Sequence, residues 1–82
     1  MAVHRVVVDV MLKPEILDPQ GQAVANALPS LGHAVPSGVR IGRHVMLDLE
    51  AGDAADALAQ ATAIAEQLLA NPVIEDFAVR LG

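Results

Sequence analysis

The chain has 82 residues and a formal net charge of −5, and its five Lys or Arg residues are scattered rather than clustered. A nucleic-acid surface needs clustered basic side chains to neutralise phosphates and aromatic rings on which bases stack. This chain has a single aromatic residue, Phe77, and no cysteine. We therefore expect no binding to nucleic acid or to an anionic membrane, no disulfides and no thiolate chemistry.

The length predicts one domain, residues 1–82, with one small core and no deep cavity. The N-terminus lacks the basic and apolar regions of a signal peptide. No apolar run approaches the roughly 20 residues that a membrane-spanning helix needs. We expect a cytoplasmic protein.

Residues 3–12 are predicted to form a strand, because three consecutive β-branched valines suit a pleated surface. Alternation separates its side chains into two faces. One face is uniformly apolar and should meet the helices, whereas the other mixes apolar and charged residues. The first face contains Val6, Val8, Val10 and Leu12, and the second contains Arg5, Val7, Asp9 and Met11.

A connection with two prolines follows this strand, and Asp18-Pro19 predicts the start of a helix. Aspartate is a favoured N-cap, and proline at the first helical position loses no hydrogen bond. Apolar residues then recur at helical spacing as far as Leu31. Pro29 predicts a kink or an early end near Leu28, with Gly32 closing the segment.

Residues 39–41 and 44–49 alternate in polarity, and Gly42-Arg43 lies between them. Two residues led by glycine between alternating runs predict a tight β-hairpin. The side chains expected in the core are Val39, Ile41, Val45, Leu47 and Leu49. Those expected to face away are Arg40, His44, Met46, Asp48 and Glu50.

Asp53 predicts the start of a second, alanine-rich helix, which Asn71-Pro72 should end. A final strand is expected between residues 73 and 81. The predicted apolar face of the helix contains Leu58, Ala61, Ala65, Leu68 and Leu69.

This order of elements predicts an α+β fold of the ferredoxin-like type, a split β-α-β sandwich with the order β-α-β-β-α-β. Both helices should pack on one face of an antiparallel four-stranded sheet. The other face should expose Val7, Met11, Met46 and Ala78 among charges. Because exposed apolar patches usually mark contacts, we expect a homodimer that uses this face or a sheet edge.

No sequence pattern indicates a catalytic site. The three histidines lack metal-ligand spacing, no serine or threonine has an elbow-like setting, and no glycine-rich phosphate cradle occurs. Glu15 and Asp18 could hold a cation or act as acid and base, but Asp18 is better explained as an N-cap, and Glu15 as a solvated or partner-facing group. Arg40 and Arg43 could grip a carboxylate or phosphate or simply keep a hairpin tip hydrated. We expect no catalytic, cofactor-binding or metal-binding residue.

Three segments in register resemble one known family. Residues 13–21 (Lys-Pro-Glu-Ile-Leu-Asp-Pro-Gln-Gly) resemble the start of the PurS family, the small subunit of bacterial phosphoribosylformylglycinamidine synthase. Residues 39–43 (Val-Arg-Ile-Gly-Arg) are similar to its Val-Arg-x-Gly-Lys hairpin, with arginine in place of the more usual lysine. Residues 68–77 are similar to the C-terminal segment of the family. Pro29 is a departure from the family pattern, because a proline at this position disturbs a regular first helix.

The resemblance implies a subunit of a glutamine-dependent carbon–nitrogen ligase in purine biosynthesis, without catalysis of its own. The expected partners are a second copy of the chain, a glutaminase subunit (PurQ) that releases ammonia, and a large synthetase subunit (PurL) that uses ATP and Mg²⁺. The small subunit would bring these together and support ammonia transfer. Motif position and expected exposure make six residues candidate subunit contacts: Lys13, Glu15, Arg40, Arg43, Glu75 and Asp76.

Two other classes share some of these features. An ACT-type regulatory domain has the same order of elements and binds an amino acid at a dimer interface, beside the loop near its first helix. The block at residues 71–77 is not an ACT feature. A stand-alone small enzyme is the third alternative, against which the missing nucleophile argues.

Overall fold

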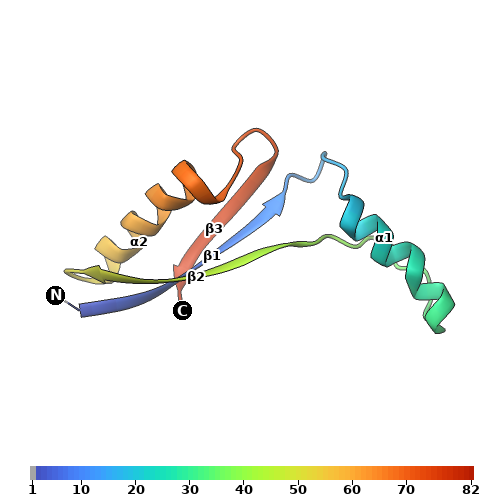
Figure 1. The fold of residues 1–82 in the computed structure, drawn as a ribbon, viewed down its shortest axis with the longest axis horizontal. Coiled ribbons are helices and arrows are strands. Elements are labelled where there is room, and N and C mark those ends of the chain that lie inside the picture. The colour runs from blue at the N-terminus through green and yellow to red at the C-terminus, as the bar shows by residue number, and fades with distance from the viewer. Residues whose placement is uncertain (1) are drawn as a thin grey trace.

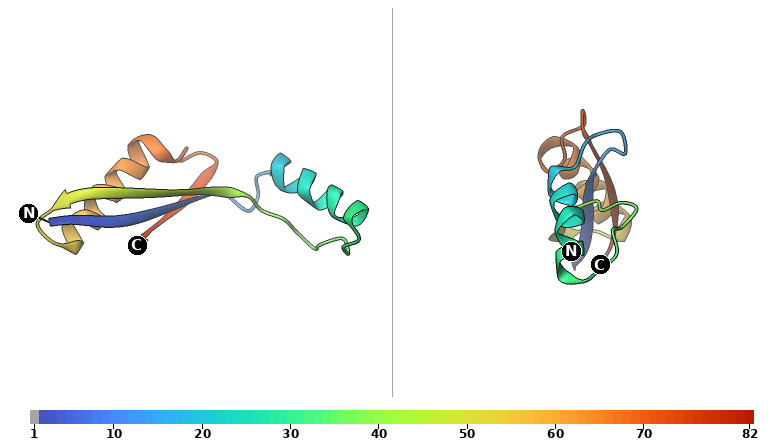
Figure 2. Two further views of the ribbon diagram at one scale, coloured as in Figure 1. Left: turned by 60° about the horizontal axis from the view of Figure 1, so that its bottom comes forward. Right: turned by 90° about the vertical axis from the view of Figure 1, so that its right-hand side faces the viewer.

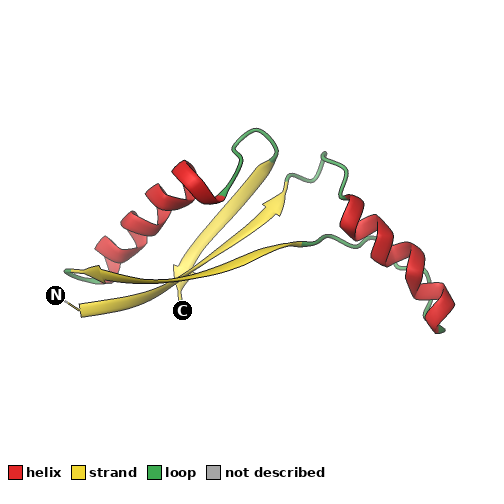
Figure 3. Ribbon diagram, in the orientation of Figure 1, coloured by secondary structure: helices red, strands yellow, loops and turns green. Residues whose placement is uncertain are grey.

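A computed structural model describes residues 2–82. It contains the strands β1 (Ala2–Leu12), β2 (Gly42–Ala51) and β3 (Glu75–Leu81) and the helices α1 (Pro19–Ala27) and α2 (Ala54–Ile64). A short 3-10 helix (Leu28–Leu31) continues α1, and a π-helical turn (Ala65–Leu69) continues α2. Figure 3 shows these elements, which confirm the predicted α+β class.

The three strands form one antiparallel sheet in the order β2-β1-β3. β1 is central, and its Val8 lies between Val45 of β2 and Val79 of β3. Val6, Val8 and Val10 are fully buried, as their alternation predicted. This face of β1 is therefore the floor of the core.

Helix α2 covers this face of the sheet (Figure 1). The Asp53 carboxylate accepts the Asp56 N–H at 2.8 Å, so the predicted N-cap is confirmed. Ala57, Ala61 and Ala65 recur every four residues and are fully buried against the strands, since small side chains let the helix approach closely. Leu68 was predicted to lie on this face, but this prediction is wrong because the side chain is 80% exposed.

The ferredoxin-like arrangement is not confirmed. The sheet of residues 2–82 has three strands rather than four, and α1 projects beyond the end of the sheet instead of covering it (Figures 1 and 2). The predicted hairpin at Gly42-Arg43 does not form, because Gly42 begins β2 and pairs with Met11 of β1. A Cβ atom at Gly42 would lie 2.3 Å from the backbone oxygen of Val10, so this glycine permits close contact between the strands rather than a turn.

The end of the first helix agrees with the sequence. α1 stops at Ala27, Pro29 lies in the 3-10 turn, and Gly32 closes it with a left-handed φ of 90°. Glycine adopts this conformation without the steric cost that a Cβ atom brings.

The face of the sheet opposite α2 carries ion pairs between strands. Arg5 pairs with Asp48 at 2.9 Å, and Asp9 contacts both His44 and Arg80. Met11 and Met46 are exposed there, as predicted, but Val7 is only 4% exposed. Its cross-strand neighbours are Met46 and Arg80, whose long side chains flank it.

The molecule is elongated, with extents of 52 × 27 × 15 Å. Its radius of gyration is 16.3 Å, whereas a compact chain of this length has one of about 12 Å. The segment responsible is the arm, defined here as residues 19–39: α1, its 3-10 turn and the extended chain that returns to β2 (Figure 2).

Candidate functional site

Five of the six predicted contact residues meet at one end of the sheet, here called the junction. In an antiparallel sheet, the end of β1 lies beside the starts of β2 and β3. Lys13 follows β1, and Glu75 and Asp76 begin β3. Arg40 precedes β2, and Arg43 is the second residue of that strand. Glu15 is exposed on the connection that leaves the junction toward α1.

Lys13 joins β1 to the start of β3. Its Nζ donates to Asp76 Oδ1 at 2.8 Å, and its backbone N–H donates to the Ile74 carbonyl at 2.8 Å. The hydrogen bond to Asp76 raises the pKa of Lys13 above its ordinary value. The pair lies at the surface, so it presents one ordered positive and one ordered negative group to a partner.

Arg43 joins β2 to β3 and to the end of α2. Its guanidinium donates to Glu75 Oε1 at 3.1 Å and to the Leu69 carbonyl at 2.6 Å. Glu75 Oε1 also accepts the Asn71 N–H at 2.8 Å. Arg43 therefore binds a carbonyl at the helix terminus, where a cation is favoured, and fixes the turn that leads into β3.

Asp18 connects the start of α1 to the segment that enters β2. It is buried, and it accepts the Gly21 N–H at 2.9 Å and the Ile41 N–H at 2.7 Å. These hydrogen bonds hold the pKa of Asp18 below its usual range. The N-cap was predicted and is confirmed, but nothing in the sequence indicated the bond to Ile41, which lies 23 residues away.

Arg40 and Gly21 close the same connection, here called the neck (residues 13–18 with 39–41). Arg40 donates to the carbonyls of Lys13 and Ile16, both at 2.9 Å. A Cβ atom at Gly21 would lie 2.1 Å from the Val39 carbonyl oxygen, so only glycine allows the two segments to approach this closely. The guanidinium of Arg40, predicted as a hairpin-tip contact, therefore binds the chain's own backbone.

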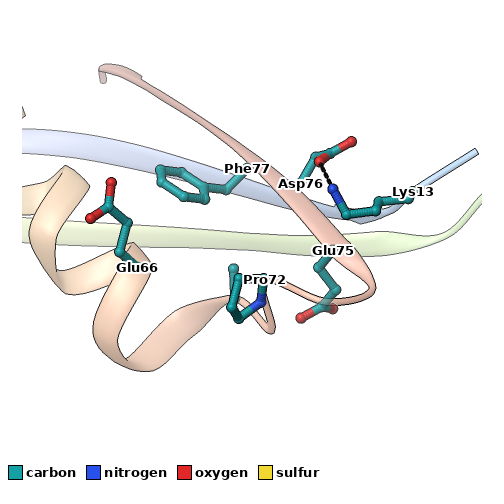
Figure 4. Close-up of a pocket in the computed structure, with 7 residues that line it drawn as sticks. Lys13, Glu66, Pro72, Glu75, Asp76 and Phe77 are labelled. Atoms are coloured by element: carbon teal, nitrogen blue, oxygen red, sulfur yellow. Dashed lines mark hydrogen bonds and ion pairs between the residues drawn. The ribbon is translucent and has the colours of Figure 1, made fainter.

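A hollow of about 430 Å³ lies beside the junction, between the end of α2 and the start of β3. Phe77, Pro72 and Ala70 supply apolar surface, and the ion pair between Lys13 and Asp76 lies on its rim (Figure 4). Glu66 and Glu75 complete its lining. An open hollow of this kind can accept an apolar side chain of a partner protein.

Among residues 2–82, the structure places no three histidine or acidic side chains where they could share a cation. Within the same described residues, no helix combines the length and the apolar character that a membrane span requires.

Comparison with known proteins gives a consistent result. The family model described as PurS, phosphoribosylformylglycinamidine (FGAM) synthase, matches residues 5–82. The chain is 53% identical over 75 residues to the phosphoribosylformylglycinamidine synthase subunit PurS of Mycobacterium leprae, covering 92% of this chain and 91% of the relative. It is 43% identical over 74 residues to the Bacillus subtilis subunit, covering 90% and 87%.

Solved structures agree over the whole length. Bacillus subtilis PurS superposes with a TM-score of 0.82 at 40% identity, covering 96% of this chain and 98% of that chain. A chain in the structure of PurLQS from Thermotoga maritima has a TM-score of 0.90 at 27% identity, with both chains covered completely. Because the arm is about a quarter of the chain, a score this high requires that the arm project in the same way.

Proposed function

Because the chain belongs to the PurS family of phosphoribosylformylglycinamidine synthase subunits in purine biosynthesis, we propose that it is the small, non-catalytic subunit that assembles this ligase. The observation that carries the proposal is the match of the entire chain to a chain of the PurLQS structure. The name of that structure joins PurS with PurL and PurQ. We extend the partnership to this chain, with PurL as the large synthetase subunit and PurQ as the glutaminase subunit.

In the proposed complex, the chemistry takes place on the partners. The glutaminase subunit releases ammonia from glutamine. The synthetase subunit uses ATP and Mg²⁺ to activate the amide oxygen of formylglycinamide ribonucleotide by phosphorylation, and ammonia then displaces the phosphate. This chain binds neither ATP nor Mg²⁺ and supports the transfer of ammonia by holding the two subunits together. The junction fits such a role, because its charges are ordered by ion pairs and hydrogen bonds within the chain.

We further propose that the subunit acts as a homodimer in the cytoplasm. The apolar side chains exposed on the arm support self-association, since larger exposed apolar patches mark interaction sites. Lys13, Glu15, Arg40, Arg43, Glu75 and Asp76 remain the predicted contacts with the larger subunits. Four of the six are exposed, and Lys13 and Glu75 are half-buried.

The test is reconstitution of the enzyme from its purified subunits. Formation of formylglycinamidine ribonucleotide is measured with and without this chain, once with glutamine and once with ammonium chloride as the nitrogen source. We expect the chain to raise the glutamine-dependent rate strongly and to have a much smaller effect on the ammonium-dependent rate. An unchanged glutamine-dependent rate together with no co-elution of the three subunits would overturn the proposal.

Calorimetry separates this function from the ACT-type alternative. A subunit that acts only in assembly should show no heat of binding with free amino acids. Micromolar binding of an amino acid by the chain alone would favour the regulatory domain instead.

A further inference from the structure

The hollow beside the junction contains a carboxylate without a partner among the described residues. Three of its lining residues are acidic, Glu66, Glu75 and Asp76, and one is basic, Lys13. Asp76 is paired with Lys13 at 2.8 Å, and Glu75 is paired with Arg43 at 3.1 Å. Within residues 2–82, neither an ion pair nor a hydrogen bond engages the carboxylate of Glu66, which is exposed. The hollow therefore carries one negative charge in excess.

The end of α2 adds to this negative charge. The helix continues as the π-helical turn Ala65–Leu69, and Glu66 belongs to this turn. The C-terminal end of a helix carries a partial negative charge, which favours a cation nearby. Turns of the π type are rare and occur frequently at functional sites. The hollow therefore favours a positively charged group.

The rest of the hollow is apolar. Ala70, Pro72 and Phe77 line it, and Phe77 is the only aromatic residue of the chain. Figure 4 shows the half-buried ring of Phe77 and the Glu66 carboxylate, both at the border of the hollow. An apolar surface with a carboxylate at its edge suits a long side chain that has an apolar stem and a cationic end.

Arginine fits this description better than lysine. Its planar guanidinium stacks on aromatic faces and binds a carboxylate through two parallel hydrogen bonds. A lysine ammonium is a strongly hydrated point charge, so it loses more hydration on entering an apolar hollow. Arginine is also one of the residues enriched among those that dominate the energy of protein interfaces.

The border of the hollow is fixed before any partner binds. Between α2 and β3, the Asn71 carbonyl accepts the N–H groups of Ile74 at 3.2 Å and Glu75 at 2.7 Å. The Asn71 side chain accepts the Val73 N–H at 3.0 Å. A site that is already ordered loses little conformational freedom on binding.

We propose that this hollow is a socket for an arginine side chain of one of the two larger subunits, with its stem on Phe77 and Pro72 and its guanidinium on Glu66. The inference rests on the proposed assembly function and deepens it by naming the chemistry of one contact. A protein, rather than a small cation, is the occupant, because Leu68 and Val73 next to the lining residues are 80% and 76% exposed. A protein surface can cover these apolar side chains around the socket and exclude water from it.

The test is binding of the chain to each purified larger subunit and to their mixture, with glutamine and ATP present. Glu66→Gln removes the charge and keeps the size, and Glu50→Gln makes the same change at another exposed acid, outside the hollow. We expect Glu66→Gln to raise the Kd at least about tenfold and Glu50→Gln to leave it unchanged. Phe77→Leu should raise the Kd about threefold, because the cation then loses its aromatic face. Urea denaturation checks that this variant folds, since Phe77 packs against the core.

Modification of the partners identifies the arginine. Each larger subunit is treated with phenylglyoxal, which reacts with arginine side chains, and the excess reagent is removed before mixing. We expect the unchanged chain and Glu66→Gln to bind the modified subunits with equal affinity, because the pair that distinguishes them is lost. A difference that survives the modification would overturn the choice of arginine.

The inference and the proposed function can fail separately. Equal affinities of the unchanged chain and Glu66→Gln for the untreated subunits would overturn the socket, while a raised glutamine-dependent rate in the reconstituted enzyme would leave the assembly function standing. An unchanged chain that neither binds the subunits nor raises this rate would overturn both.

Discussion

The sheet with α2 and the arm are built on different principles. In the first region, valines of the central strand and alanines of α2 are fully buried, and the core is complete enough to fix one arrangement. In the second, a single carboxylate and a glycine are buried at the neck, and apolar side chains face outward. The first region is held by contacts within the chain, whereas the second leaves its apolar side chains exposed.

Two leucines of similar exposure allow this difference to be tested. Leu31 in the arm is 72% exposed and Leu68 at the end of α2 is 80% exposed. Burying a leucine stabilises by about 1.5–3 kcal/mol, and a homodimer that uses the arm, as proposed, buries two copies of Leu31. Leu31→Asp should therefore weaken dimerisation at least about 100-fold, as measured by analytical ultracentrifugation. Leu68→Asp is the control, and an equal loss with that variant would contradict the distinction between the two regions.

A second pair of variants tests the other region by enlarging an alanine in the core between α2 and the sheet. Ala61 is fully buried between α2 and the strands, whereas Ala63 on the same helix is exposed. Ala61→Leu should lower the free energy of unfolding by about 2 kcal/mol, because a well-packed core resists additional methylenes. Ala63→Leu should change it by less than about 0.5 kcal/mol. Urea denaturation of both variants measures the difference, and similar midpoints would show that α2 packs more loosely than its burial indicates.

The neck should respond to acid through Asp18. Since hydrogen bonds from Gly21 and Ile41 hold the folded pKa below the unfolded value of about 3.9, the stabilisation is complete above that value. It is lost as the pH falls through the lower, folded pKa. Amide exchange at Ile41 should therefore accelerate in acid relative to the amides of β1.

Asp18→Asn provides the matched variant. An asparagine side chain still offers one oxygen to the Gly21 N–H, but its NH₂ group cannot accept the Ile41 N–H. Ile41 should then exchange rapidly at neutral pH, without an added acid response beyond the intrinsic rate. Protection of Ile41 equal to that of the unchanged chain would show that Asp18 does not hold the neck.

Local features of the fold were predictable from the sequence because they depend on neighbouring residues. The two faces of β1, the N-caps at Asp18 and Asp53 and the helix end at Pro29 all follow from spacing and backbone preference. The predicted hairpin at Gly42 was wrong, because a glycine that lets two strands approach closely, here at the backbone of Val10, has the same sequence signature as a glycine in a turn. The position of α1 was wrong because the contacts that hold it are not made by neighbours in the chain.

The candidate site shows the same division. Charge and motif position selected Lys13, Arg43, Glu75 and Asp76, and the antiparallel order of strands places them together. The ion pairs that these residues form with one another could not be predicted. The sequence does not distinguish a charged side chain that faces a partner protein from one that binds a neighbouring strand of the same chain. The hydrogen bonds from Arg40 to backbone carbonyls were also not predicted, because no pattern of side chains in the sequence indicates those acceptors.

Glu15 separates folding from assembly most cleanly, because its substitution should have the smallest effect on the chain itself. It is exposed on the connection between the two regions, and a surface substitution of this kind usually changes stability by less than about 0.5 kcal/mol. Glu15→Lys should leave dimerisation and unfolding unchanged but slow association with the larger subunits, since rim charges act mainly on the association rate. Stopped-flow measurement at low and high salt checks this, with Glu50→Lys, another exposed acid outside the junction, as the control. Equal association rates for the two variants would remove Glu15 from the predicted contacts. The surface predicted to meet the larger subunits would then be the ordered ion pairs of the junction, with the hollow beside them.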